Sequence, residues 1–170
     1  MMGQLLFAST FLAALGSGLI AGNFFAFSAY TLPALRRLPP ATGIAAMQSI
    51  TTAAIKSPLF LVVFFGTAAL AGLLGLAAPL EWSKPSALYL LIGSLLYLNG
   101  PFGVTLMKNL PLNNKLAVIK PGSPEGASLW REYLSSWSTW NHVRTVMSLA
   151  ACASFIMALV EGGTPLPSRD

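Results

Sequence analysis

The sequence predicts an all-α integral membrane protein, a four-helix bundle with helical cytoplasmic loops. Three observations lead to this fold class. The 170 residues are 55% hydrophobic and only 9% charged, whereas soluble domains carry roughly 25% charged residues. The chain contains charge-free apolar runs of the length that a bilayer requires, and its few basic residues collect on one side of them. We therefore expect residues 1–170 to form a single transmembrane domain.

The predicted spans follow from the thickness of a bilayer, because a hydrocarbon core of about 30 Å takes about 20 helical residues. The first three charge-free spans cover about residues 5–30, 57–80 and 85–107. The fourth charge-free run, Thr145–Val160, is too short, so we expect its helix to begin near Thr139 and to span about residues 139–160. The first span lacks a basic leading region and a small-residue cleavage site, which indicates a retained helix and not a signal peptide.

The charges between the spans predict the orientation in the membrane. Seven basic residues fall in the first and third loops: Arg36, Arg37, Lys56, Lys108, Lys115, Lys120 and Arg131. Only Lys84 and Arg169 fall on the other side. Because cytoplasmic loops carry an excess of lysine and arginine, we expect loops 1 and 3 in the cytoplasm and both termini on the opposite side.

Both basic loops contain helix signals. In the first, prolines precede a predicted short helix, residues 42–54, that carries Gln48 and rests on the membrane surface or the mouth of the bundle. In the third, Asn113 and Asn114 favour a turn. Ser123 then suits the N-cap of a helix with Pro124 at its first position.

Small residues recur at every fourth position of the first span, at Ala14, Gly18, Gly22 and Ala26. This spacing lets helices approach closely in lipid. It indicates either a contact within the bundle or the seam of a homo-oligomer.

A polar and aromatic cluster begins the fourth span. Trp137, Trp140, Asn141 and Arg144 recur at helical spacing, and His142, the only histidine, lies about 100° round the helix from Asn141. Polar groups at this depth usually face a bundle interior or a water-filled cavity. Structural roles remain open for each: interfacial anchoring for the tryptophans, snorkelling for Arg144 and packing for His142.

The composition argues against several activities. One histidine and one cysteine, Cys152, leave no CxxC pair and no cysteine-rich metal site, so we expect no metal. The spans lack the carboxylate that an ion-coupled transporter commonly uses. The thinly spread basic residues form no stripe for nucleic acid.

The remaining side chains suit proton abstraction from a flat, membrane-soluble phenolic or polycyclic compound. His142 is a candidate general base, since histidine titrates near neutrality. Arg144 or Asn141 can stabilise the resulting anion. Aromatic rings clamp such a substrate well, and the candidates are Trp137, Trp140 and either Phe24 or Phe27.

Four segments together resemble a family of small four-span membrane proteins, mostly uncharacterised, that includes the anthrone oxygenases. They are GLIAGNFFAFSAYTLPAL (residues 18–35), GIAAMQSI (43–50), PLNNKL (111–116) and WSTWNHVRTVMSL (137–149). Thr51 stands where many relatives carry asparagine.

This resemblance implies oxidation of an anthrone to an anthraquinone by O2 without a metal or organic cofactor. It also implies site roles for Gln48 and Asn113 beside Trp137, Asn141, His142 and Arg144. An enzyme of this kind predicts that Gln48, Asn113, Asn141, His142 and Arg144 surround one pocket. The alternative is a non-catalytic membrane protein that binds a lipid or quinone or serves as a partner subunit.

Overall fold

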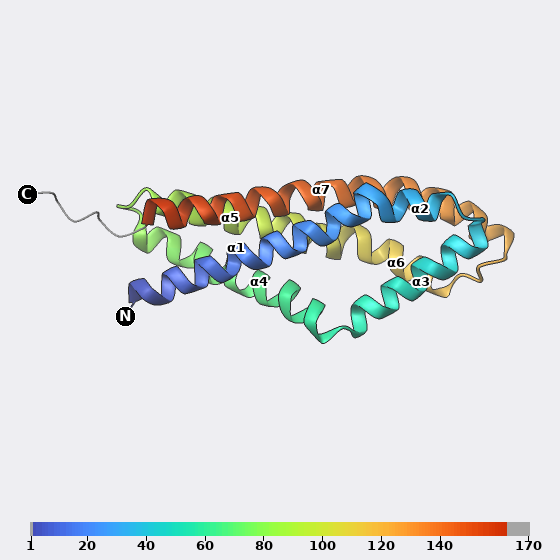
Figure 1. Cartoon of the computed structure of the whole chain (residues 1–170), viewed down its shortest axis with the longest axis horizontal. Helices are drawn as coiled ribbons and strands as arrows, with labels where there is room; N and C mark the ends of the chain where they lie inside the picture. The colour runs from blue at the N-terminus through green and yellow to red at the C-terminus, as the bar shows by residue number, and fades with distance from the viewer. Residues whose placement is uncertain (1, 163–170) are drawn as a thin grey trace, which may run out of the picture.

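The computed structural model describes residues 2–162, and these residues form helices without strands. Four continuous helical segments are long and apolar enough to cross a membrane: Gly3–Arg36, Pro58–Glu81, Ser86–Val118 and Pro124–Gly162. They lie roughly along one axis and give an elongated bundle (Figure 1). The prediction of an all-α, multi-pass membrane bundle is confirmed.

The longest helices pack against each other. Helix α1 (Met2–Ala26) continues through a π-helical segment (Phe27–Thr31) into α2 (Leu32–Arg36), and α7 (Pro124–Gly162) is a single 39-residue helix. Figure 1 shows α1 and α7 running together along the bundle. At about 1.5 Å per residue, α7 is much longer than a bilayer core. Part of it therefore extends beyond the membrane as a scaffold for the first and third loops.

Proline sets the limits of the helix in the first loop. Helix α3 (Pro40–Lys56) begins after Pro39 and extends two residues beyond the predicted 42–54 at each end. It ends at Ser57, whose backbone is extended, because a residue before proline disfavours the helical conformation. The Ser57 hydroxyl then accepts a hydrogen bond from the backbone N–H of Phe60, at 3.3 Å, and caps α4 (Pro58–Ala77).

The third membrane segment changes its helical geometry at a proline. Helix α5 (Ser86–Tyr97) leads into a π-helical segment (Leu98–Asn109) that contains Pro101, and α6 (Leu110–Val118) follows. Proline lacks the N–H that an α-helix needs, and wider turns of this kind often occur at functional sites. Gly100 lies so close to Met147 that an added Cβ would overlap with the Met147 Cβ, so glycine permits this segment to touch α7.

The predicted turn at Asn113 and Asn114 is wrong, because both residues lie inside α6. Burial of Leu112 and Leu116 on one face of α6 outweighs the local turn preference of the asparagines. The helix start predicted at Ser123 and Pro124 is confirmed, and this helix runs without a break into the fourth span, so the fourth membrane helix begins at Pro124 and not near Thr139. The Ser123 hydroxyl accepts a hydrogen bond from the backbone N–H of Gly126, at 3.0 Å, and Pro124 is the first helical residue.

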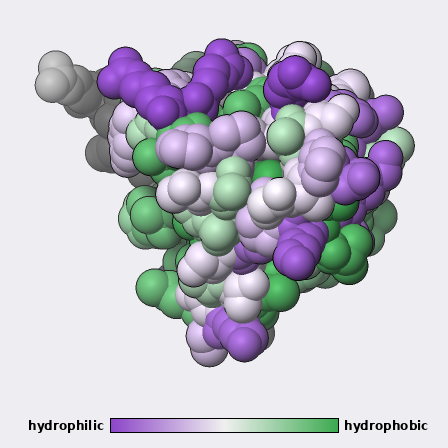
Figure 2. All heavy atoms as spheres, turned by 90° about the vertical axis from the view of Figure 1, so that its right-hand side faces the viewer, coloured by the Kyte–Doolittle hydropathy of each residue, from purple (hydrophilic) through white to green (hydrophobic). Residues whose placement is uncertain are grey.

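The molecule has two hydrophobic cores, which follow each other along the bundle axis. The bundle core joins α1, α4, α5 and α7 around residues such as Phe64, Leu90, Tyr97 and Phe155. The head core joins α2, α3, α6 and α7 around residues such as Ile44, Met47, Leu116 and Trp130. Figure 2 looks onto the head end, where hydrophilic residues predominate. The head core thus keeps the loops folded above the membrane-spanning part.

Candidate functional site

A cavity of about 340 Å³ lies where the bundle core meets the head core. Its apolar wall includes Phe24, Phe27, Met47, Ile50, Leu110, Phe60 and Trp137. Its polar lining consists of Asn23, Thr51, Ser57, Thr105, Asn113 and Arg144. A concave, mostly apolar cavity with a few polar groups, at a volume of roughly 300–1,000 Å³, is typical of sites for small organic ligands. We call it the Arg144 cavity.

Among the described residues, Arg144 is the only charged side chain that lines the Arg144 cavity, and it is 4% exposed. Its Nη1 donates to the Thr105 hydroxyl at 3.0 Å, and its Nη2 donates to Asn141 Oδ1 at 2.8 Å. Its guanidinium carbon lies 4.0 Å from the ring centroid of Phe24 and 4.8 Å from that of Trp137. Aromatic faces at these distances attract a cation, so the guanidinium is held on both its edges and its faces.

The two acceptors of Arg144 are themselves fixed in orientation. The Asn141 amide nitrogen donates to the Phe24 carbonyl and to the Ser28 hydroxyl, both at 2.8 Å, which turns Oδ1 toward Arg144. The Thr105 hydroxyl donates its hydrogen to the Pro101 carbonyl at 2.5 Å and therefore offers lone pairs to Arg144. Asn141 is fully buried and does not line the cavity. It positions Arg144.

The charge of Arg144 has no neutralising partner among residues 2–162. No carboxylate lines the cavity, and the one ion pair of the described residues joins Lys84 and Glu81 near the opposite end of the bundle. The Arg144 Nε hydrogen is buried and has no hydrogen-bond partner there either. Buried charges are normally paired, because an isolated one is costly. This cavity therefore favours an anionic or strongly hydrogen-bond-accepting ligand.

Asn113 provides a second polar contact on the cavity wall. Its Oδ1 accepts hydrogen bonds from the Tyr133 hydroxyl, at 2.7 Å, and from Trp137 Nε1, at 2.8 Å. These two donors engage the oxygen and leave the amide nitrogen without a partner in the part of the chain that is described. Phe27 packs on Trp137 with ring centroids 5.4 Å apart. Asn113 thus offers an N–H donor beside an aromatic wall.

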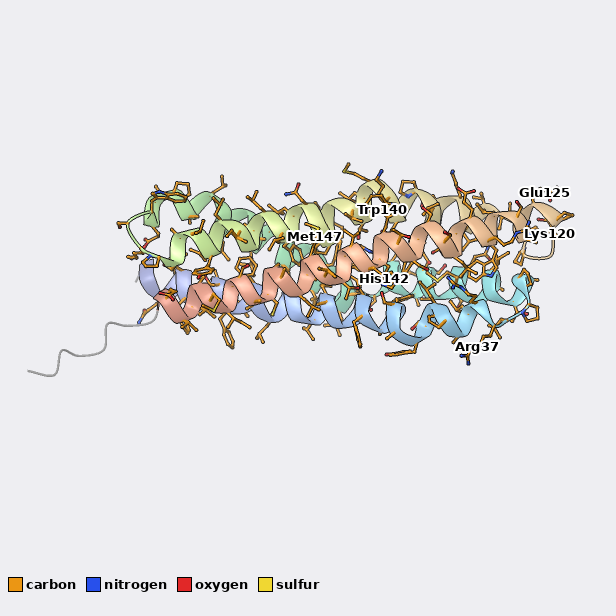
Figure 3. All side chains as sticks on the ribbon, turned by 90° about the horizontal axis from the view of Figure 1, so that it is seen from above. Arg37, Lys120, Glu125, Trp140, His142 and Met147 are labelled. Atoms are coloured by element: carbon orange, nitrogen blue, oxygen red, sulfur yellow. The ribbon has the colours of Figure 1, made fainter. Side chains whose placement is uncertain are left out.

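The other predicted site residues lie outside the Arg144 cavity. His142 is exposed and lines a separate pocket with Ser28, Ser138 and residues of α2. Trp140 lies on the opposite side of α7 from His142 (Figure 3). The Lys108 ammonium lies over the Trp140 ring, 4.9 Å from the ring centroid. Gln48 donates to the carbonyls of Leu116 and Ile119, at 2.8 and 3.0 Å, and ties α3 to the end of α6. The prediction that all five residues of this set surround one pocket is therefore wrong: Asn113 and Arg144 line the Arg144 cavity, and the other three do not.

Four polar residues of the cavity lining were not predicted as site residues: Asn23, Thr51, Ser57 and Thr105. Buried Asn109, which does not line the cavity, donates to the Trp137 carbonyl at 3.3 Å. A threonine inside an apolar membrane helix was an available signal for Thr105, because its hydroxyl commonly donates to the carbonyl four residues before it, here that of Pro101, and keeps its lone pairs for another donor. The sequence contained no comparable sign for Asn23 or Asn109.

Fold and site together define a class: a small multi-pass membrane protein with a ligand-sized cavity and a buried, unpaired guanidinium near one membrane face. The profile of the anthrone oxygenase family matches residues 60–154, which is more than half of the chain. The chain belongs to the anthrone oxygenase family. The matched range contains Thr105, Asn113, Trp137, Asn141 and Arg144. No curated protein and no solved structure matches the chain.

Proposed function

We propose that this protein catalyses the O2-dependent oxidation of a lipophilic phenolic or polycyclic compound, as the name of its family suggests, and that the Arg144 cavity binds this substrate as its anion. The observation that carries the proposal is the buried guanidinium that no carboxylate neutralises. A substrate anion supplies the missing negative charge.

The cavity suits a flat, apolar molecule with one anionic oxygen. Phe24, Phe27 and Trp137 provide aromatic surfaces, and aromatic pairs gain about 0.5–1.5 kcal/mol beyond area burial. The donors without a partner among residues 2–162 include Arg144 Nε and the Asn113 amide nitrogen, which suit an oxygen atom of the substrate. The site lies where helices enter the membrane, so a lipophilic substrate reaches it from lipid.

The reaction balances with O2 as the oxidant. The substrate's methylene group loses a proton and becomes an enolate, which Arg144 stabilises electrostatically. The electron-rich carbon then reacts with O2 to form a C–O bond. Cleavage of the O–O bond gives a carbonyl at that carbon and one molecule of water, which takes up both methylene hydrogens. The protein's own contribution is to hold and stabilise the enolate.

In this reaction water, and not His142, accepts the methylene proton. His142, the single histidine of the sequence, does not line the Arg144 cavity, and no carboxylate of residues 2–162 lines it. By stabilising the anion, Arg144 lowers the pKa of the bound substrate, so that a weak base suffices. In this proposal His142 makes no contact with the substrate.

The same observation supports a second candidate function, non-catalytic binding of an anionic lipophile such as a phenol or quinol. The lining of the Arg144 cavity has no histidine or carboxylate among the described residues to act as a general base. Such a cavity can bind an anion without converting it to a product. The two functions differ in whether O2 is consumed.

The test is O2 consumption by purified protein in detergent with a simple anthrone, corrected for the spontaneous rate. A blocking variant, Ala54→Phe, fills the cavity, and the matched control Ala45→Phe places the same ring on the exposed face of α3. We expect the wild type and the control to accelerate quinone formation. In the blocking variant the rate should fall at least about tenfold, because a misplaced substrate is no longer oriented for reaction. Anthrone binding without O2 consumption would favour the second function.

A further inference from the structure

A second pocket, of about 320 Å³, lies on the other side of α7 from Trp140 and close to α2. Arg36 of α2, Arg37 directly after it and His142 of α7 line it together with Ser28 and Ser138. We call it the His142 pocket. Leu32 and Pro33 complete the lining, so the pocket combines cations and hydroxyls with a small apolar surface.

The basic groups of the His142 pocket have no neutralising partner in the part of the chain that the structure describes. Within residues 2–162, no carboxylate lines the pocket. Neither Arg36, Arg37 nor His142 makes a side-chain hydrogen bond or an ion pair to any residue between 2 and 162. Converging donors with one sign of charge raise the local concentration of anions. A phosphate group, with several acceptor oxygens, suits two adjacent arginines.

The position of the pocket relative to the membrane indicates where such a phosphate comes from. His142 lies three residues before the charge-free run Thr145–Val160 of α7. One and two helical turns further along the same face lie Val146 and Leu149, which are 65% and 53% exposed. Cationic donors therefore lie at headgroup depth, directly above an apolar surface that faces the acyl chains.

We propose that the His142 pocket binds the phosphate of an anionic phospholipid, with the acyl chains lying along Val146 and Leu149. Arg36 and Arg37 contact the phosphate, and Ser28 and His142 contribute hydrogen bonds to the headgroup. Basic pockets between membrane helices commonly bind such headgroups. This site is separate from the Arg144 cavity, and its existence does not depend on the proposed oxidation.

The test compares lipid binding to the full-length protein in detergent by native mass spectrometry. Phosphatidylglycerol and phosphatidylcholine with identical acyl chains are titrated, and inorganic phosphate is added as a competitor. We expect phosphatidylglycerol to bind about tenfold more tightly or better, since each basic residue near an anionic lipid contributes appreciably. An excess of inorganic phosphate should leave that preference unchanged, because phosphate lacks the acyl chains.

The variant Arg36→Gln/Arg37→Gln should lose the preference, and the control Lys115→Gln/Lys120→Gln should keep it. All four residues are exposed, so both variants should fold, which their thermal unfolding checks. Equal binding of the two lipids would overturn the proposal, and so would an equal loss in the control. Displacement of phosphatidylglycerol by inorganic phosphate would show that the ligand is free phosphate and would overturn the lipid assignment.

Discussion

The Arg144 cavity and the His142 pocket lie on different faces of one helix, and they differ in what surrounds the charge. Arg144 is buried and held by neutral acceptors and aromatic rings. His142, Arg36 and Arg37 line the other pocket and are exposed. An interaction with a charge is much stronger where water is excluded. Burial therefore makes the Arg144 cavity suitable for stabilising a reactive anion, and exposure makes the His142 pocket suitable for a headgroup.

The comparison also shows how one short sequence contributes to two sites. Asn141 and His142 are neighbours in the chain, but each residue of a helix turns by about 100°. Asn141 consequently points toward α1 and Arg144, whereas His142 faces the pocket beside α2. Ser28 is common to both surroundings: it accepts a hydrogen bond from Asn141 and lines the His142 pocket.

The largest expected effect on turnover comes from replacing Arg144, in contrast to Arg36 and Arg37 of the His142 pocket. Arg144→Met should lower anthrone turnover by at least about 100-fold, the usual loss when one oxyanion donor is removed. Arg36→Gln/Arg37→Gln should leave turnover nearly unchanged. O2 consumption corrected for the spontaneous rate measures both. Similar losses in the two variants would show that the cavity is not the site of reaction.

A second variant keeps Arg144 and neutralises its surroundings. Asn141→Asp places a carboxylate 2.8 Å from Nη2 if the side chain keeps its position. Binding of a phenolate should weaken by at least about tenfold, because the guanidinium then has an opposite charge as its partner. The control is Asn114→Asp, which adds the same charge on the exposed face of α6. Fluorescence titration with a phenolic ligand gives both affinities. Unchanged affinity in Asn141→Asp would contradict the electrostatic role of Arg144.

A third variant addresses the cavity wall. Trp137→Phe keeps an aromatic ring but removes the N–H that bonds Asn113 Oδ1. The free energy of unfolding should fall by about 0.5–1.5 kcal/mol, the usual net value of a hydrogen bond. Trp140→Phe should cost less, because Trp140 is half-buried and contacts Lys108 through its ring face. Thermal unfolding in detergent compares them, and an equal loss would argue against the Asn113 contact.

The smallest effect on turnover is expected for the histidine. His142→Gln should change anthrone oxidation by less than about twofold, whereas loss of a general base commonly costs about 10²–10⁴-fold. The same O2 assay decides this. A loss comparable to that of Arg144→Met would assign His142 the base role and contradict the division between the two sites.

Features set by local sequence could be predicted. The apolar runs gave the number of membrane helices, and Ser123 with Pro124 gave the start of α7, because span length and helix capping depend on neighbouring residues. The helical spacing of Trp137 and Arg144 likewise indicated that both face one site. The orientation of loops 1 and 3 toward the cytoplasm remains a prediction from charge.

Features set by contacts between distant segments could not be predicted. Asn113 and Asn114 favour a turn locally, but packing of Leu112 and Leu116 keeps α6 helical. Thr105 reaches Arg144 from a π-helical segment whose geometry departs from ordinary helical spacing. Asn141 and His142 belong to different sites because α1 and α2 pack on different faces of α7. A helical wheel of α7 alone does not give the positions of these neighbouring helices.

The most direct test of the central claim is the pKa of a phenolic ligand inside the Arg144 cavity. A monohydroxylated anthraquinone serves as the probe, because its visible absorption changes when the phenol ionises. The unpaired guanidinium should lower the phenol's pKa by at least about one unit, or ~1.4 kcal/mol, relative to the probe in protein-free micelles. Arg144→Met should abolish this shift. A bound probe with the same pKa in wild type, Arg144→Met and empty micelles would contradict the claim that this cavity stabilises an anion.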